Sequence, residues 1–272
     1  MELRTEGGDE MRIAVIQFPG TNCEHETLVA VRECGMDGEI FRWNRPEQEL
    51  CEFDGYVIPG GFSYQDRVRA GVIASKEPVM ATLREEAANG KPIIGICNGF
   101  QILVESGILP FGDGVRLALA QNVMIRGGEI VRRGYYCAWT MLRHDAEEKR
   151  CSGSYILRRG EILSIPIAHA EGNLVASDRK VIERLIEDDQ IVFRYCSPQG
   201  EIINEFPVNV NGSTENIAGI SNPEGNVLGM MPHPERAFFA WQLPRKHPRI
   251  PGYGPGRKIF DSMKRYIEER RS

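Results

Sequence analysis

The stretch KPIIGICNGFQILVESG, from Lys91 to Gly107, constrains the fold of this chain more than any other. It begins with a short apolar run, residues 92–96, that is typical of a buried parallel strand. Apolar residues then recur at helical spacing until Gly107, a common helix stop. Cys97 stands between the two elements in a Gly-x-Cys-x-Gly pattern, the form of a strand-to-helix turn that presents a nucleophile. We therefore predict a buried strand, a tight turn at Cys97 and a helix.

Several features of this turn favour a reactive thiol. The partial positive charge at a helix N-terminus stabilises a thiolate at Cys97. Gly95 and Gly99 lack a Cβ atom, so strand and helix can close on each other around a strained residue. Gln101 follows about one helical turn after Cys97, which puts its amide on the same helix face. A buried structural cysteine is the alternative, because most free cysteines are of that kind.

The overall composition is that of a globular protein, with 42% hydrophobic and 26% charged residues among 272. A formal net charge of −5 argues against nucleic-acid binding. No apolar run approaches the ~20 residues of a membrane span, and residues 1–11 lack a signal-peptide core. The seven cysteines include no Cys-x-x-Cys pair, which argues against a disulfide framework and a zinc site. We expect a cytoplasmic protein without a metal.

From residue 12 onward, strand and helix patterns alternate with short glycine-rich turns. This alternation predicts an α/β fold with a mainly parallel, doubly wound sheet flanked by helices. The first half has predicted strands at 12–18, 39–43, 56–58 and 92–96, and helices at 26–34 and 78–89. In the second half we predict a loop at 112–134, strands at 135–142, 161–167, 191–195, 217–220 and 227–231, and helices at 181–188 and 259–270. We expect a flexible tip at residues 1–10 and a single domain from 11 to 272.

A cysteine nucleophile needs a base, and the chain has five histidines. Three are predicted to be surface residues because their surroundings are charged or proline-rich: His25, His144 and His247. The other two begin His-x-Glu patterns, in which the carboxylate two residues later can hold the ring and fix its tautomer. These pairs are His169 with Glu171 and His233 with Glu235.

The sequence before each pair gives a modest preference between them. His233 follows the apolar run 227–231, which is typical of a central strand, and substrate crevices in such sheets lie at the carboxyl ends of the strands. His169 follows a run interrupted by Pro166, which indicates an edge strand or a bulge. The residues alone therefore favour His233 as the base and leave His169 open.

A pair of glycines, Gly60 and Gly61, directly follows the predicted strand 56–58. Their backbone N–H groups, with that of Asn98, could form an oxyanion hole. Glycine pairs also occur in ordinary turns, so both interpretations stay open.

Together these stretches resemble the class I, cysteine-triad glutamine amidotransferases, and most closely the glutaminase subunits of phosphoribosylformylglycinamidine synthases. The matching segments, in chain order, are FPGTNC (18–23), IPGGFSYQDRVRAG (58–71), GICNGFQ (95–101), IPIAHAEG (165–172), FRYC (193–196), NVNGS (209–213) and NVLGMMPHPERA (226–237). The resemblance implies a flavodoxin-like sheet with an antiparallel extension. The sequence departs from the family pattern at Gln65, Arg67, Val68, Ala138 and Ala170, and the loop at 112–134 is longer than expected. None of these departures falls in the implied triad.

The resemblance also implies a role for each matching residue. Cys97 would be the nucleophile, His233 the base and later the acid, and Glu235 the group that orients the imidazole. The remaining matches would form the oxyanion hole (Gly60, Gly61 and Asn98) and contact the substrate, L-glutamine (Phe62 and Gln101).

The implied activity is hydrolysis of glutamine through a cysteine thioester, with ammonia passed to a large synthetase subunit. In purine biosynthesis that subunit converts formylglycinamide ribonucleotide to formylglycinamidine ribonucleotide, and a small third subunit often bridges the two. ATP and Mg²⁺ would be used by the synthetase, so no cofactor is expected in this chain. Since His169 and Glu171 form a polar motif beside the crevice, we expect them to face the synthetase or to line the ammonia exit. Three alternatives stay open: a stand-alone cysteine hydrolase, the amidotransferase component of another pathway and a non-catalytic regulatory subunit.

Overall fold

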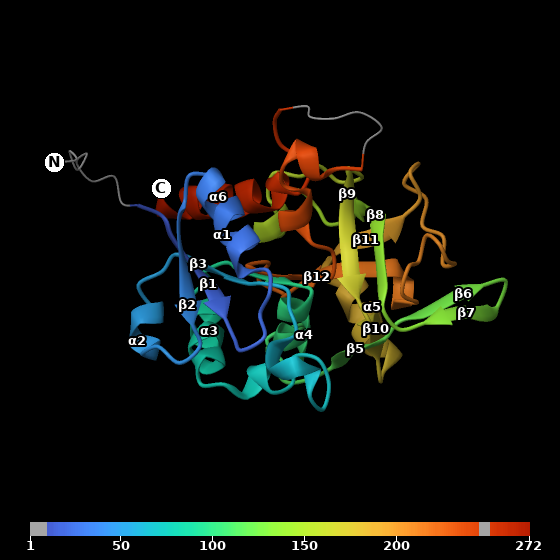
Figure 1. Cartoon of the computed structure of the whole chain (residues 1–272), viewed down its shortest axis with the longest axis horizontal. Coiled ribbons are helices and arrows are strands. Elements are labelled where there is room, and N and C mark those ends of the chain that lie inside the picture. The colour runs from blue at the N-terminus through green and yellow to red at the C-terminus, as the bar shows by residue number, and fades with distance from the viewer. Residues whose placement is uncertain (1–9, 245–250) are drawn as a thin grey trace.

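The computed structural model describes residues 10–244 and 251–272, so residues 1–9 of the predicted tip and His247 lie outside the described residues. A nine-stranded sheet runs through the molecule in the order β2-β1-β3-β4-β13-β12-β11-β8-β9 (Figure 1). Its first five strands are parallel neighbours: β2 Asp37–Arg42, β1 Arg12–Gln17, β3 Gly55–Ile58, β4 Ile93–Ile96 and β13 Val227–Met230. Each begins and ends within two residues of its predicted bounds, which confirms the parallel half of the predicted sheet.

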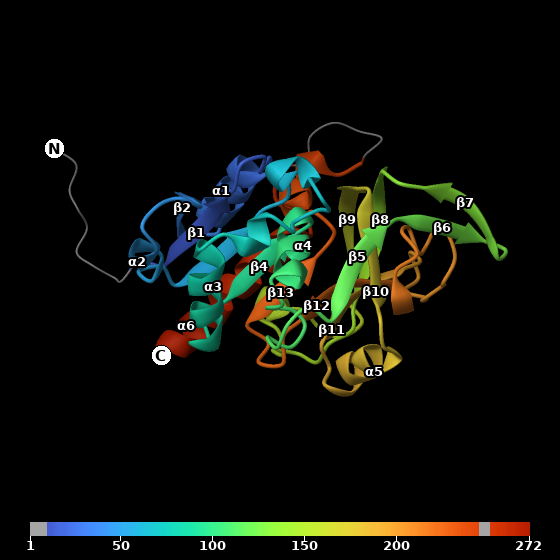
Figure 2. The ribbon, with the colours of Figure 1, turned by 90° about the horizontal axis from the view of Figure 1, so that it is seen from below.

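Helices cover both faces of this parallel part. One face carries α1 Glu24–Glu33 and α6 Arg257–Arg271, and the other carries α3 Val79–Ala88 and α4 Asn98–Glu105 (Figures 1 and 2). A short helix, α2 Glu47–Leu50, precedes β3. Because both faces are covered, every residue of β3 and β4 is buried.

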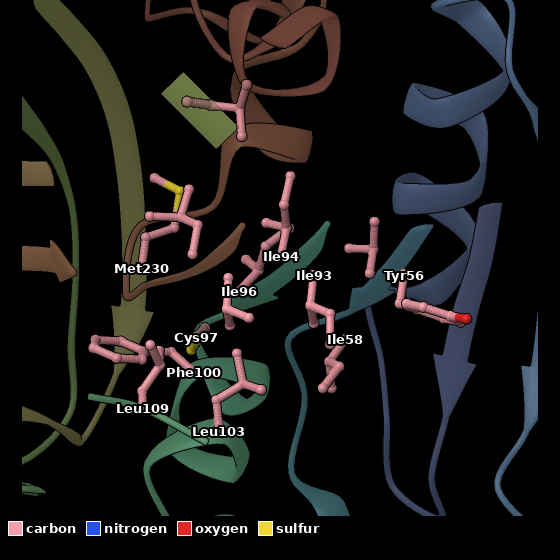
Figure 3. Packing of buried hydrophobic residues seen from close by; sticks show 14 of the residues in the cluster. Tyr56, Ile58, Ile93, Ile94, Ile96, Cys97, Phe100, Leu103, Leu109 and Met230 are labelled. Atoms are coloured by element: carbon pink, nitrogen blue, oxygen red, sulfur yellow. The ribbon is translucent and has the colours of Figure 1, made fainter. Parts of the chain in front are cut away.

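The strand β4 lies in the middle of the hydrophobic core. Figure 3 shows its side chains Ile93, Ile94 and Ile96 among Tyr56 and Ile58 of β3, Met230 of β13, and Phe100 and Leu103 of α4. The helix packs so closely on the sheet that a Cβ atom at Gly229 would lie 2.1 Å from the Phe100 ring. Cys97, at the junction of β4 and α4, is therefore held by rigid elements on both sides.

The remaining four strands of the sheet are antiparallel, as the resemblance implied: β12 Ile217–Ser221, β11 Ile191–Cys196, β8 Tyr136–His144 and β9 Ile162–His169. The helix α5 Arg179–Glu187 precedes β11. The strand that contains Pro166, β9, forms the edge of the sheet, which confirms its predicted edge position. A proline is tolerated there because an edge strand does not need every N–H for pairing.

The prediction of a loop at 112–134 is wrong. This segment contains β5 Leu117–Gln121, β6 Val123–Arg126 and β7 Glu129–Arg133. The last two pair as a hairpin, and β5 pairs with a strand that we did not predict, β10 Glu171–Ala176. The adjacent glycines at the hairpin tip, Gly127 and Gly128, have positive φ angles of 58° and 79°, as in a two-residue hairpin turn. All of β7 is exposed, so its sequence lacks the apolar alternation by which strands are recognised.

The surface position predicted for His144 is also wrong, whereas His25 is exposed as predicted. His144 is fully buried because β8 continues two residues beyond its predicted end, and both ring nitrogens bond to protein oxygens, those of Arg158 and Ser154. In the part of the chain that the structure describes, no helix is long and apolar enough to cross a membrane.

Candidate active site

Cys97 occupies the tight turn that the sequence predicts between β4 and α4. Its backbone has φ 51° and ψ −105°, a combination that residues with a side chain rarely adopt. The flanking glycines make the turn possible, since a Cβ atom at Gly99 would lie 1.9 Å from the carbonyl oxygen of Ile58 and one at Gly95 would lie 2.8 Å from Gly99 itself. The predicted strained junction is confirmed, and it directs the Cys97 sulfur to within 4.0 Å of the Ala168 carbonyl oxygen.

His233 follows β13, the strand next to β4 in the sheet, and its ring is held by Glu235. The Nδ1 atom lies 2.6 Å from Oε1 of Glu235, and both side chains are buried. The backbone N–H of His233 donates to the carbonyl of Pro166 at 2.8 Å, which fixes this segment to β9. Within the described part of the chain, Nε2 has no hydrogen-bond partner. With Nδ1–H donating to the carboxylate, Nε2 is the nitrogen that is free to take a proton.

The electrostatic surroundings of His233 favour its charged form. Burial by itself lowers the pKa of this imidazole, but the Glu235 carboxylate, and after it the sulfur of Cys97, outweigh burial and hold the pKa well above its usual value. A proton taken from the thiol of Cys97 would thus be stabilised on the ring.

Cys97 and His233 open into the same pocket, which has a volume of about 100 Å³. Its lining comes from six separate parts of the chain: Asn22, Cys23, Gly61, Phe62, Cys97, Tyr135, Ala168, His233 and Arg236. Phe62 and Tyr135 are about half exposed, at 50% and 47%, so these two aromatic side chains lie where the pocket meets solvent.

The two glycines of the predicted oxyanion hole lie differently. Gly60 is behind His233, and a Cβ atom there would be 2.6 Å from the ring carbon Cε1. Gly61 lines the pocket. Asn98 begins α4 directly after Cys97, so its N–H belongs to the helix end that faces the turn. The oxyanion-stabilising role of these groups stays a prediction.

Gln101, which we predicted to contact glutamine, is held by two bonds within the protein. Its Nε2 donates to the carbonyl of Glu171 at 2.6 Å, and its Oε1 accepts from Nδ2 of Asn98 at 2.8 Å. Asn98 in turn accepts from the N–H of Ser63 at 3.1 Å. This chain of bonds ties the first turn of α4 to the segments on either side of the pocket.

His169 lies inside the protein, so its ring does not face a partner, and the alternative expectation that it lines the ammonia exit stays a prediction. It is only 3% exposed, and its Nδ1 lies 3.2 Å from Nδ2 of Asn122. Burial, and then the nearby charge of His233, lower the pKa of His169 to about 3, which keeps the ring neutral. The carboxylate of Glu171 accepts a hydrogen bond from the N–H of Ala70 at 3.2 Å. His169 and Glu171 therefore do not bond to each other, whereas His233 and Glu235 do.

Sequence reasoning missed five of the residues that line the pocket, of which two, Cys23 and Arg236, contact each other. The guanidinium of Arg236 donates to the sulfur of Cys23 and to a carboxylate oxygen of Glu26, each at 3.2 Å. Both residues belong to segments that carry the resemblance, and that was the available signal.

Among the described residues, Cys23, His233 and Glu235 form a group whose potential metal-ligand atoms lie within 4.8 Å of one another. The guanidinium beside the sulfur opposes a cation there.

Comparison with known proteins identifies the family of the chain. Residues 10–267 match the family described as the CobB/CobQ-like glutamine amidotransferase domain. The phosphoribosylformylglycinamidine synthase subunit PurQ of Methanosarcina acetivorans is 42% identical over 260 residues, which cover 95% of this chain and 99% of that protein. The protein of the same name from Pyrococcus furiosus is 43% identical over 257 residues, which cover 94% and 99% of the two chains.

A chain in a solved structure described as PurLQS from Thermotoga maritima superposes with a TM-score of 0.72 and 32% identity, over 95% of this chain and 99% of that one. A second solved structure, of a putative GMP synthase subunit from Thermoplasma acidophilum, gives a TM-score of 0.58 and 15% identity, over 97% and 98% of the two chains, and shows the shared fold alone. The extent of these matches shows that the chain belongs to the CobB/CobQ-like glutamine amidotransferase domain family.

Proposed function

We propose that this chain is the glutaminase subunit of a phosphoribosylformylglycinamidine synthase, which releases ammonia from L-glutamine for a synthetase subunit. The observation that carries the chemistry is the strained Cys97 in one pocket with an imidazole whose Nδ1 is held by Glu235 and whose Nε2 is free. The destination of the ammonia rests on the relatives, which match over nearly their whole length and carry that name.

In the first half of the reaction, Nε2 of His233 takes the thiol proton and the Cys97 sulfur attacks the carboxamide carbon of glutamine. The carbonyl oxygen becomes an oxyanion that the N–H groups of Gly61 and Asn98 stabilise. When the C–N bond breaks, the imidazolium of His233 gives its proton to the leaving nitrogen, which departs as ammonia. A γ-glutamyl thioester remains on Cys97.

In the second half, a water molecule gives a proton to His233 and adds to the thioester carbon. Collapse of this intermediate breaks the C–S bond, and the sulfur recovers its proton from the imidazolium. The sum is glutamine and water converted to glutamate and ammonia. Throughout, the carboxylate of Glu235 holds the ring in one orientation and stabilises its positive charge.

The ammonia would pass to a large synthetase subunit, with a small third subunit bridging the two, in the cytoplasm. ATP and Mg²⁺ would belong to that synthetase, because the steps derived above need only protons and a thiolate. The solved complex described as PurLQS, which contains a similar chain, supports such an assembly.

Replacement of the nucleophile tests the proposal. Cys97→Ala or Cys97→Ser should abolish glutamine-dependent synthesis by the reconstituted complex and leave ammonia-dependent synthesis intact, since added ammonia bypasses the thioester. A glutamine-like electrophile should label Cys97 and none of the other six cysteines. Loss of both activities would indicate a structural cysteine. A wild-type chain that supports only a different synthetase would indicate another pathway, and one without glutaminase activity in the complex would indicate a regulatory subunit.

A further inference from the structure

The hairpin formed by β6 and β7 has no role in the chemistry derived above. Both views show it projecting beyond β8 and β9, away from the body of the molecule (Figures 1 and 2). Its exposed surface includes three apolar side chains: Ile125, Ile130 and Val131 are 38%, 49% and 51% exposed. An isolated two-stranded ribbon is marginally stable in water, and exposed apolar strand edges invite association with another protein.

The base of the hairpin is nevertheless held by contacts with the rest of the protein. The N–H of Phe206 donates to the carbonyl of Ile125 at 2.7 Å, and the guanidinium of Arg126 lies 5.3 Å from the Phe206 ring centre. On the other strand, Arg132 lies over the ring of Tyr136 at 5.2 Å. The structure therefore presents the exposed side chains on a braced arm.

The charge of the hairpin is opposite to that of the chain as a whole. Residues 123–134 contain three arginines and one glutamate, a net charge of +2, whereas the whole chain carries −5. Within the described parts of the chain, no carboxylate forms an ion pair with Arg126, Arg132 or Arg133. Guanidinium groups without a carboxylate partner, beside exposed apolar side chains, fit a partner that offers an apolar patch bordered by carboxylates.

The hairpin is continuous with the entrance of the catalytic pocket. Tyr135, which lines that pocket and is half exposed, lies two residues after the end of β7. Gly134 lies between β7 and Tyr135, and its carbonyl accepts a hydrogen bond from Nδ2 of Asn122. The same Nδ2 also donates to the carbonyl of His169 at 2.8 Å. A protein that receives ammonia from the pocket must cover its entrance, and such a protein would reach the hairpin.

We propose that the β6–β7 hairpin is a docking arm for the synthetase subunit, which meets it with an apolar surface bordered by carboxylates; this inference rests on the proposed function. A second copy of this chain fits less well. A twofold interface through the hairpin would bring the arginines of one copy close to those of the other.

The test changes two exposed residues on one face of the hairpin and leaves its bracing residues unchanged. Val131 and Arg133 lie two residues apart on one strand and so share a face. The variant Val131→Glu/Arg133→Glu changes the charge by −3. The control, Ile186→Glu/Lys180→Glu on α5, makes the same charge change at a side chain that is 49% exposed and at an exposed lysine.

The dissociation constant for the purified synthetase should rise at least about tenfold for the hairpin variant, the effect of losing about 1.4 kcal/mol, and change less than twofold for the control. Glutamine hydrolysis by each isolated variant should stay within twofold of wild type, which also shows that both fold.

Wild-type affinity in the hairpin variant would overturn the inference while leaving the proposed function intact. Self-association of the wild-type chain that the hairpin variant abolishes, with synthetase binding unchanged, would assign the arm to a second copy and also overturn it. A wild-type chain that neither binds nor supplies the synthetase would refute the proposed function itself.

Discussion

The substitution Gly60→Ala should separate the positioning of the catalytic imidazole from the chemistry of the thiol. The φ angle of Gly60 lies outside the left-handed region, so alanine meets no backbone strain there. Its Cβ atom, however, would lie 2.6 Å from Cε1 of His233 and 3.2 Å from Nδ1. An ordinary contact begins near 3.4 Å, so the ring must retreat by 0.8 Å, the difference between 3.4 and 2.6 Å.

A displacement of that size moves the ring relative to both Glu235 and the sulfur of Cys97. Misplacement of a catalytic group by about 1 Å costs roughly 10²-fold in rate, or about 2.7 kcal/mol. We therefore expect kcat/KM for glutamine hydrolysis to fall about 10²-fold, measured as glutamate production by the reconstituted complex. Ammonia-dependent synthesis should be unchanged, because the synthetase site is not altered.

Alkylation of Cys97 by iodoacetamide distinguishes this cause from damage to the oxyanion hole. Alkylation needs the thiolate that His233 sustains but forms no oxyanion, so its rate should also fall in Gly60→Ala. Gly38→Ala is the control, because the atoms nearest to a Cβ atom on this β2 glycine would be side-chain carbons of Leu28 and Val31, each at 2.9 Å, and not a catalytic residue. An unchanged alkylation rate with lost hydrolysis, or an equal loss in the control, would refute the reasoning.

Two further predictions concern the titrating groups around the pocket. His233→Ala should reduce hydrolysis by about 10²–10⁴-fold, as expected for a lost general base, whereas His169→Ala should keep most of the activity because that ring is neutral and bonded to Asn122. Equal severe losses in two variants with native circular dichroism would contradict this division. Burial, and then the charge of Glu171, raise the pKa of Asp66 to about 6, so its stabilising contribution is complete below the unfolded-state pKa and is lost as the pH rises through 6. Asp66→Asn should therefore increase Tm more at about pH 7.5 than at about pH 4, and an equal change at both pH values would count against it.

The sequence determined those parts of the site that are local in the chain. A strand, two glycines and a helix are contiguous around Cys97, so their steric requirements alone impose the tight turn. In the same way, His233 and Glu235 are two residues apart, and the bond between them needs no distant element. Most of the parallel strands were predictable because their apolar runs are short, continuous and buried on both faces, as in β3 and β4.

Only the tertiary structure decided which of these local units meet. Cys97 and His233 share a pocket because β13 pairs with β4 in a register that aligns Met230 with Ile96, and no pattern within either strand specifies its neighbour. The burial of His169 likewise depends on Asn122, a residue distant in sequence, and the place of Cys23 depends on Arg236. The hairpin escaped prediction since all of β7 is exposed and β6 has a single buried residue, so neither strand carries a burial pattern. Local sequence encodes backbone conformation through sterics and hydrogen bonding, whereas the meeting of distant segments is set by the packing of the whole core, to which every strand and helix contributes.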